Sequence, residues 1–135
     1  MKYRLLDILA CPYDKKFPLK LIVFSEKKYE RRQVKFEKMP VCEIYCGLLR
    51  KDVKELDLSK VDCEECIKLE VVEGVLICEE CKRWYPIRDE IPILLPDELR
   101  NKEEDLKFME KYKDKFPEEI LRGGKPFNLS SSLEE

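Results

Sequence analysis

Short apolar runs alternate with charged stretches along the first hundred residues, and each run predicts one element of structure. Residues 5–9 place four apolar side chains around Asp7, which predicts one or two helical turns that pack on a core and end before Pro12. The apolar run 19–24, bounded by a proline and a serine, predicts a strand. The chain therefore begins with a short helix followed by a strand.

The residues from Val71 onward predict the rest of a sheet. The runs 71–72 and 75–77 flank Glu73-Gly74, which predicts a hairpin in which Gly74 supplies a positive φ. A further strand is predicted at 84–87.

After a turn at 88–90, the apolar run 91–95 predicts the last strand. Pro92 has no N–H to donate to a ladder, so this strand should lie at a sheet edge. Such an edge exposes backbone groups and apolar side chains unless the C-terminal helix or a partner protein covers them.

Between these two parts of the sheet, the sequence 26–69 is interpreted as an insertion, because its first half is highly charged and lacks a clear period. Apolar residues at helical spacing predict one short amphipathic helix inside it: Leu48, Leu49, Val53, Leu56 and Leu58.

The C-terminal part predicts another amphipathic helix, capped by Asp97 and ended before Pro117. Its apolar residues recur at spacings of three, four or seven: Leu99, Leu106, Met109, Tyr112 and Phe116. Residues 118–121 predict a further helical turn that Gly123-Gly124 stops. The final residues, which include three serines at 130–132 and a Leu133-Glu134 pair typical of vector-derived ends, are expected to be mobile.

Composition narrows the function classes. The chain has no histidine, which removes the commonest general base and every imidazole metal ligand. Its four glycines form no phosphate-binding motif.

The net charge is only −2 although 41% of the residues are charged, so a partner protein is favoured over nucleic acid or membrane. The excess of Lys and Glu is typical of hyperthermophiles and suggests an archaeal source. No apolar stretch approaches ~18 residues, so a cytoplasmic protein is expected.

Two cysteine segments, far apart in the chain, carry the strongest chemical signal. Cys11-x-x-Asp14 and Cys78-x-x-Cys81 have the spacing of the two knuckles that close a tetrahedral zinc ribbon, with a carboxylate in place of the fourth thiolate. The alternative is that these cysteines are buried hydrophobes or form a disulfide. Any metal here would be structural zinc, and the site could also be empty.

The insertion contains a second cysteine set with the count and pairing of a metal site: Cys42, Cys46, Cys63 and Cys66. Two disulfides or unpaired thiols in a heat-resistant lobe are the alternative, which we favour here. Spacing alone does not separate the two interpretations.

These elements predict an α+β fold, with a small zinc-ribbon-like antiparallel sheet, a short N-terminal helix, an inserted cysteine-containing lobe and a C-terminal amphipathic helix. The predicted division is a discontinuous ribbon-like domain at 1–25 and 70–97, a lobe at 26–69, and a C-terminal helix with a mobile tail at 98–135.

Three segments together resemble one known family. They are Leu5–Pro12 (LLDILACP), Glu73–Cys81 (EGVLICEEC) and Tyr85–Leu95 (YPIRDEIPILL). They look like the small activator subunit of class I methyltransferases, and the resemblance covers residues 1–24 and 70–100.

The resemblance implies a non-catalytic subunit that forms a heterodimer with catalytic subunits, which methylate tRNA, ribosomal RNA or translation release factors. It implies a partner-binding strand formed by Ile91, Pro92, Ile93, Leu94 and Leu95, with Leu5 and Leu9 in the adjoining apolar patch. It also implies that S-adenosylmethionine binds to the partner and not to this chain. Eukaryotic members that bind zinc have a cysteine where this chain has Asp14, which leaves zinc in question.

Two other functions remain open at this point. The run 27–32, with Tyr29 among basic residues, could contact RNA as an accessory or make the chain a zinc-ribbon module of a transcription or translation complex. The pair Cys78 and Cys81 could be a redox dithiol, but that chemistry needs a thiol at a helix N-terminus, and here the pair joins two predicted strands.

Overall fold

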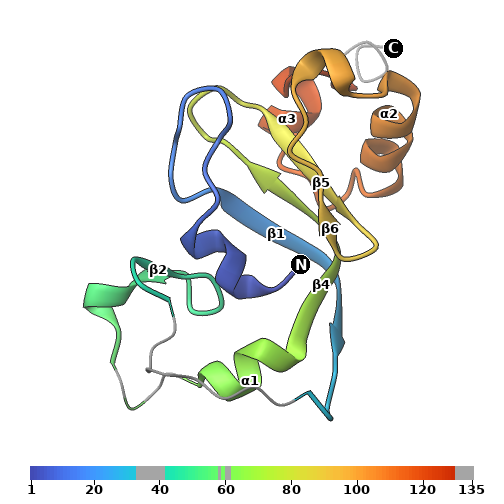
Figure 1. Ribbon diagram of the computed structural model, residues 1–135. Helices are drawn as coiled ribbons and strands as arrows, with labels where there is room; N and C mark the ends of the chain where they lie inside the picture. Colours follow the sequence, from blue (N-terminus) through green and yellow to red (C-terminus); the bar gives the residue numbers. More distant parts are fainter. Residues whose placement is uncertain (33–41, 58, 60–61, 130–135) are drawn as a thin grey trace.

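A four-stranded antiparallel sheet forms the centre of the protein (Figure 1), and its strand order is β1-β4-β5-β6. The computed structural model describes residues 1–32, 42–57, 59 and 62–129. The fold is α+β with an antiparallel sheet, as the sequence predicts. The strands are β1 (Lys20–Lys28), β4 (Leu69–Ile77), β5 (Trp84–Arg88) and β6 (Ile91–Pro92).

The hairpin expected at Glu73-Gly74 is wrong, because β4 runs through both residues without a turn. Gly74 has an ordinary negative φ; its role is close packing. A Cβ at this position would lie 2.6 Å from the carbonyl oxygen of Ile22 on β1. The register between β1 and β4 shifts at Val23 and Ser25, so the glycine lies where β1 bulges toward it.

The turn predicted after β5 is confirmed. Asp89 and Glu90 have φ values of 50° and 71°, which places two non-glycine residues in the left-handed region of a tight hairpin. The strand that follows is shorter than predicted: β6 contains only Ile91 and Pro92, although the Ile93 amide still donates to the carbonyl of Pro86 at 2.9 Å. The edge position predicted from Pro92 is confirmed.

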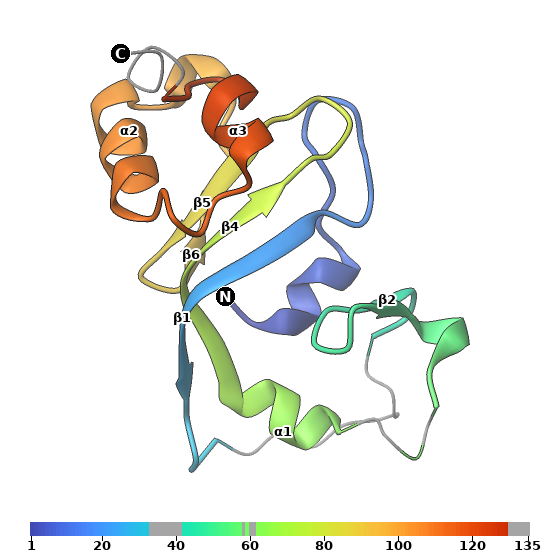
Figure 2. The ribbon, with the colours of Figure 1, turned by 180° about the vertical axis from the view of Figure 1, so that it is seen from behind.

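The first face of the sheet is covered by η1 (Tyr3–Asp7), a 3-10 helix at the position of the predicted helical turns. Leu6 belongs to the same buried core as Leu21, Val71 and Tyr85, which come from three strands. In Figures 1 and 2, β2 and α1 of the inserted segment lie on the same side of the sheet as η1.

The opposite face is covered by α2 (Lys102–Lys111) and α3 (Glu118–Gly123), as Figure 2 shows from behind. Strand residues alternate between the two faces, so Trp84 packs under these helices while its neighbour Tyr85 belongs to the first core. The second core is rich in aromatic rings in mutual contact, which are Phe24, Trp84, Phe108, Tyr112 and Phe116.

The C-terminal helix is shorter than predicted. Its N-cap is Asn101, whose side chain accepts a hydrogen bond from the Glu104 amide at 3.1 Å, and Asp97 instead begins the separate 3-10 turn η4 (Asp97–Leu99). Leu99 lies outside the helix and is 66% exposed. The end of α3 at Gly123, with Gly124 as its C-cap, agrees with the sequence. The tail from Ser130 lies outside the described residues.

The helix predicted in the inserted segment is wrong. Residues of that span form β3 (Lys51–Asp52) and the 3-10 turn η2 (Val53–Glu55), and β2 (Tyr45–Cys46) lies just before it. Leu58 lies outside the described residues. A helix occurs later, as α1 (Cys63–Lys68), because Asp62 caps it by accepting from the Glu65 amide at 3.0 Å.

Candidate metal centre and partner strand

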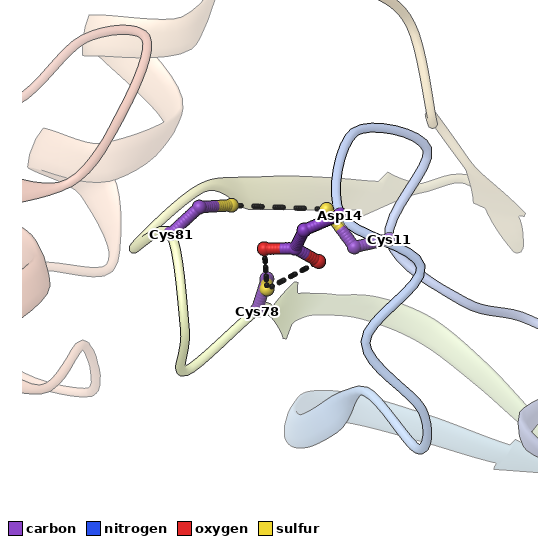
Figure 3. A group of neighbouring side chains, drawn as sticks. All are labelled: Cys11, Asp14, Cys78 and Cys81. Carbon is purple, nitrogen blue, oxygen red and sulfur yellow. Dashed lines mark hydrogen bonds between the residues drawn. The ribbon is translucent and has the colours of Figure 1, made fainter.

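Cys11, Asp14, Cys78 and Cys81 come together at one end of the sheet (Figure 3). Their ligand atoms all lie within 4.8 Å of one another. Two loops supply them, one before β1 and one between β4 and β5. The four residues singled out from spacing are therefore positioned to bind a metal ion.

The first loop has a tight hydrogen-bonded turn. The Cys11 amide donates to the carbonyl of Lys16 at 3.0 Å, and the Lys15 amide donates back to the carbonyl of Cys11 at 2.9 Å. Lys15 has a φ of 64°, which reverses the chain after Asp14.

The second loop repeats this geometry. The Cys78 amide donates to the carbonyl of Arg83 at 2.9 Å, the Lys82 amide donates to the carbonyl of Cys78 at 2.9 Å, and Lys82 has a φ of 65°. Cys81 precedes this residue just as Asp14 precedes Lys15. Asp14 therefore occupies the position that a second thiolate has in the other loop.

The donor spacing fits a tetrahedral ion. A zinc–sulfur bond of about 2.3 Å requires sulfurs about 3.8 Å apart in a tetrahedron, and the sulfurs of Cys11 and Cys81 are 3.7 Å apart. The Cys78 thiol donates to the two carboxylate oxygens of Asp14 at 3.4 and 3.3 Å. Figure 3 shows the four side chains pointing toward one another.

The protonation of these groups follows from their contacts. The Lys16 amide, which donates to Asp14 at 2.9 Å, lowers the pKa of that carboxyl to about 2. Burial opposes ionisation of Cys11, but hydrogen bonds from the Tyr85 hydroxyl and backbone amides hold its pKa below the usual value. Burial and the Asp14 carboxylate raise the pKa of Cys78. A metal ion would replace the proton that Cys78 presents to Asp14.

Sequence reasoning missed the residues that support the site. The Tyr85 hydroxyl lies 3.4 Å from the Cys11 sulfur and is fully buried with it. Tyr13 belongs to the first loop, and its hydroxyl accepts a hydrogen bond from the Asp97 amide at 2.7 Å. Tyr13 lies within the first cysteine segment and Tyr85 closely follows the second. This proximity in sequence is the signal from which both could have been predicted to lie beside the site.

Arg83 joins the second loop to the same place. Its guanidinium lies 3.6 Å above the Tyr13 ring and binds both carboxylate oxygens of Asp97 at 2.9 and 3.2 Å. This contact, helped by the nearby Cys81 thiol, raises the pKa of Arg83. Both loops are thus tied to the chain just after residues 91–95.

Residues 91–95 present apolar side chains at the sheet edge. Ile91 is 62% exposed and Leu95 is 39% exposed, while Leu94 packs against the first core. Leu5 and Leu9 are half-buried and pack against that same core, so the structure places them around the same cluster as Leu94. Pro92 and Ile93 are also half-buried.

The inserted cysteines lie apart from this centre. Cys42, Cys46, Cys63 and Cys66 are half-buried, and no disulfide joins any of the seven cysteines, all of which the structure describes. Within the described ranges, the group around Cys11 is the one arranged so that it could hold a metal ion.

The basic run has internal partners. Lys28 pairs with Glu65, and Arg32 donates to Glu70 at 2.7 Å. Tyr29 donates its hydroxyl to Glu90 at 2.5 Å. Lys28 and Arg32 are thus paired with carboxylates of the chain itself, which disfavours the interpretation of this run as an RNA-binding patch. In the described part of the chain, no helix is long and apolar enough to cross a membrane.

Two comparisons with known proteins show what the chain is similar to. Residues 2–90 match the family described as Trm112p-like protein. A curated relative, a UPF0434 protein of Dechloromonas aromatica (strain RCB), is 45% identical over 38 residues. These residues are 28% of this chain and 66% of the relative, so the chain spans just under two thirds of that protein. The relative is bacterial, and the archaeal source expected from composition stays a prediction.

Proposed function

The chain belongs to the Trm112p-like family, and we propose that it is a non-catalytic subunit that binds, stabilises and activates S-adenosylmethionine-dependent methyltransferases. The proposed substrates of its partners are tRNA, ribosomal RNA or translation release factors. The proposed assembly is a cytoplasmic heterodimer with a class I catalytic subunit.

The edge at Ile91–Leu95 carries this proposal. β6 ends the sheet, and the exposed side chains of Ile91 and Leu95 flank a segment whose Leu94 is anchored in the core. Strand addition to such an edge supplies main-chain hydrogen bonds for affinity, and alternate side chains enter pockets of the partner for specificity. Leu5 and Leu9 are proposed to extend the contact.

Zinc at Cys11, Asp14, Cys78 and Cys81 is proposed as a structural ion. Three thiols and one carboxylate fill four tetrahedral positions and leave none open for a substrate. The chain also has no histidine that could act as a base beside the ion. The ion would cross-link the loop that contains Tyr13 and the loop that leads to Arg83. Because both residues bind Asp97, the ion would also stabilise the segment that follows the partner strand.

The test is binding to catalytic subunits identified by affinity purification of the tagged chain from its source cells. Ile91→Asp and Leu95→Asp each place a carboxylate in the proposed interface, which should cost several kcal/mol of binding if the side chain is desolvated there. Co-expressed catalytic subunit should then lose solubility, while the thermal unfolding of each isolated variant stays near wild type.

Leu99→Asp is the matched control, because Leu99 is equally apolar and 66% exposed but lies outside the strand. Ile93→Asp is a harsher variant, since Ile93 is half-buried and its charge could also affect the fold. Variants at 91 and 95 that fold normally and still bind and solubilise the catalytic subunit would show that this strand is not the interface.

The absence of catalysis has its own test. We propose that the isolated chain neither binds S-adenosylmethionine nor transfers methyl groups, because its sequence has no glycine-rich strand-to-helix turn of the dinucleotide type. Calorimetric titration with the cofactor should show no heat of binding. Micromolar binding to the isolated chain would overturn this part of the proposal.

A further inference from the structure

The inserted lobe, here residues 42–57, 59 and 62–68, contains a third turn of the metal-loop type. The Arg50 amide donates to the carbonyl of Cys46 at 2.8 Å, Arg50 has a φ of 57°, and Cys46 pairs with Lys51 across the β2–β3 ladder. In the loops that begin at Cys11 and Cys78, the amide of the fifth residue likewise donates to the carbonyl of the first residue. That fifth residue also has a positive φ in both loops. Cys46 therefore occupies the position from which those two loops present their first thiol.

Gly47 fixes this turn against the rest of the protein. A Cβ on Gly47 would lie 2.2 Å from the carbonyl oxygen of Tyr3 and 2.9 Å from a methyl carbon of Leu6. Only glycine allows the β2–β3 hairpin to pack so closely on η1. The position of Cys46 is thus set by a helix of the main core.

Asp7, at the end of η1, holds the segment that leads to Cys46. Its carboxylate accepts hydrogen bonds from the amides of Glu43, Ile44 and Tyr45 at 2.9, 2.7 and 2.8 Å. Three such bonds constrain the chain between Cys42 and Cys46. The two thiols therefore stand at the two ends of a clamped loop.

The other two thiols come from α1. Cys63 and Cys66 are three residues apart on a helix, so they share one face. Cys66 packs against the first core, as do Tyr45 and Leu48 of the hairpin. The helix and the clamped loop therefore meet over the same cluster.

All four cysteines are half-buried. The helix η1 contacts both segments that hold them, the β2–β3 hairpin and α1. The loop and the helix therefore pack on one common element of the fold.

The lobe has little apolar core of its own. Among its described residues, only Gly47 and Ile67 are buried. Its regular structure amounts to two strands of two residues, one 3-10 turn and the six-residue α1. Lobes of this kind need a cross-link, and no disulfide is formed among these cysteines.

We propose that Cys42, Cys46, Cys63 and Cys66 form a second, structural zinc site with four thiolate ligands. In this proposal the loop and the helix close on the ion as it binds. Each thiol releases its proton to water as its sulfur becomes a ligand. The site is independent of the partner strand, and its existence does not depend on methyltransferase binding.

The experiment counts zinc in the full-length chain, purified with zinc and then exchanged into metal-free buffer, by native mass spectrometry. Wild type should hold two zinc ions. Cys63→Ser and Cys66→Ser should each hold one, and Cys78→Ser, the matched control in the first centre, should lose the other one. A variant lacking both sets should hold none.

A second measurement on wild type avoids variants that fail to fold. Alkylation followed by peptide mapping should show the four lobe thiols protected in the zinc-loaded chain and modified after a chelator is added. Equal alkylation with and without chelator would overturn the proposal. So would a disulfide between lobe cysteines in the purified chain, or a zinc count that does not change in both Cys63→Ser and Cys66→Ser.

Discussion

The two cysteine sets use a similar turn in very different surroundings. Around Cys11 and Cys78, both fully buried, the strands of the central sheet and the Tyr85 side chain form a packed wall. Around Cys46 and Cys63, most side chains are exposed or half-buried, and the hairpin rests on η1 through Gly47. The first set is attached to a large buried core, whereas few side chains are buried around the second set.

This difference separates two roles of a structural ion. At the first centre, an ion would join two loops whose positions the sheet already determines, so its loss should leave the fold intact. In the lobe, an ion would replace the apolar burial that short segments do not provide. Stability should therefore depend on metal unequally along one chain, and four predictions test this.

The largest effect is expected from metal removal. A structural zinc site contributes an apparent ~10–16 kcal/mol to folding in small domains, so chelation should unfold the lobe and leave the sheet folded. Hydrogen exchange measured by mass spectrometry should show lost protection in peptides from 42–57 and 62–68, with β4 (Leu69–Ile77) unchanged. Equal loss in both regions would contradict the comparison.

The next effect probes the sheet itself. Trp84 is fully buried between α2 and the strands, so Trp84→Ala should destabilise the protein by about 3–5 kcal/mol. Denaturant unfolding measures this change. Leu99→Ala is the control and should shift stability by less than about 0.5 kcal/mol, because Leu99 is exposed. At denaturant concentrations too low to unfold it, the Trp84→Ala variant should bind as much zinc as wild type.

A third prediction concerns Asp14, which occupies the position of a thiolate. Asp14→Cys should give a four-thiolate centre that binds zinc about tenfold more tightly, a gain of ~1.4 kcal/mol, because thiolate is a softer ligand for this ion than carboxylate. Competition with a chromophoric chelator measures the affinity. Asp14→Asn serves as the opposite control and should bind more weakly. Unchanged affinity in both variants would show that residue 14 is not a ligand.

The smallest effect is a pH dependence. Arg83 holds the pKa of Asp97 below its usual value, so the charged carboxylate stabilises the folded state. That stability is present above the ordinary carboxyl pKa and is lost as the pH falls through the lower folded value. Because both side chains are partly exposed, the contribution should be about 0.5–1 kcal/mol.

The measurement for this pair is the stability difference between wild type and Asp97→Asn, followed from pH 6 downward. The difference should shrink as Asp97 becomes protonated. A difference that is constant with pH would mean that the ion pair does not support the loops.

Local signals in the sequence predicted the sheet and the first centre well. The spacing of Cys78 and Cys81 between two apolar runs is enough to identify a turn, because that turn is closed by hydrogen bonds within six residues. Pro92 likewise determines an edge position through its own missing N–H. Features of this kind depend on neighbours in sequence.

Other features depended on distant contacts, and there the sequence misled. Gly74 was interpreted as a turn residue, but it is required because the backbone of Ile22 passes close to it. The leucines at 48 and 49 were assigned to a helix, yet the contact of Gly47 with Tyr3 holds them in a hairpin turn. Asp97 was expected to cap a helix, but it binds Arg83 instead. No spacing rule within a segment reveals a partner that is far along the chain.

The shortness of β6 affects how readily two copies of the protein could aggregate through their sheet edges. A long, flat edge strand would pair with the same edge of another copy and seed aggregation. Here regular pairing covers only Ile91 and Pro92, one of which lacks an N–H. Just before β5, Arg83 is already bridged to Lys125. Two copies of so short an edge have few hydrogen bonds to offer each other. The apolar side chains at 91 and 95 can thus stay exposed without making the edge a template for fibrils.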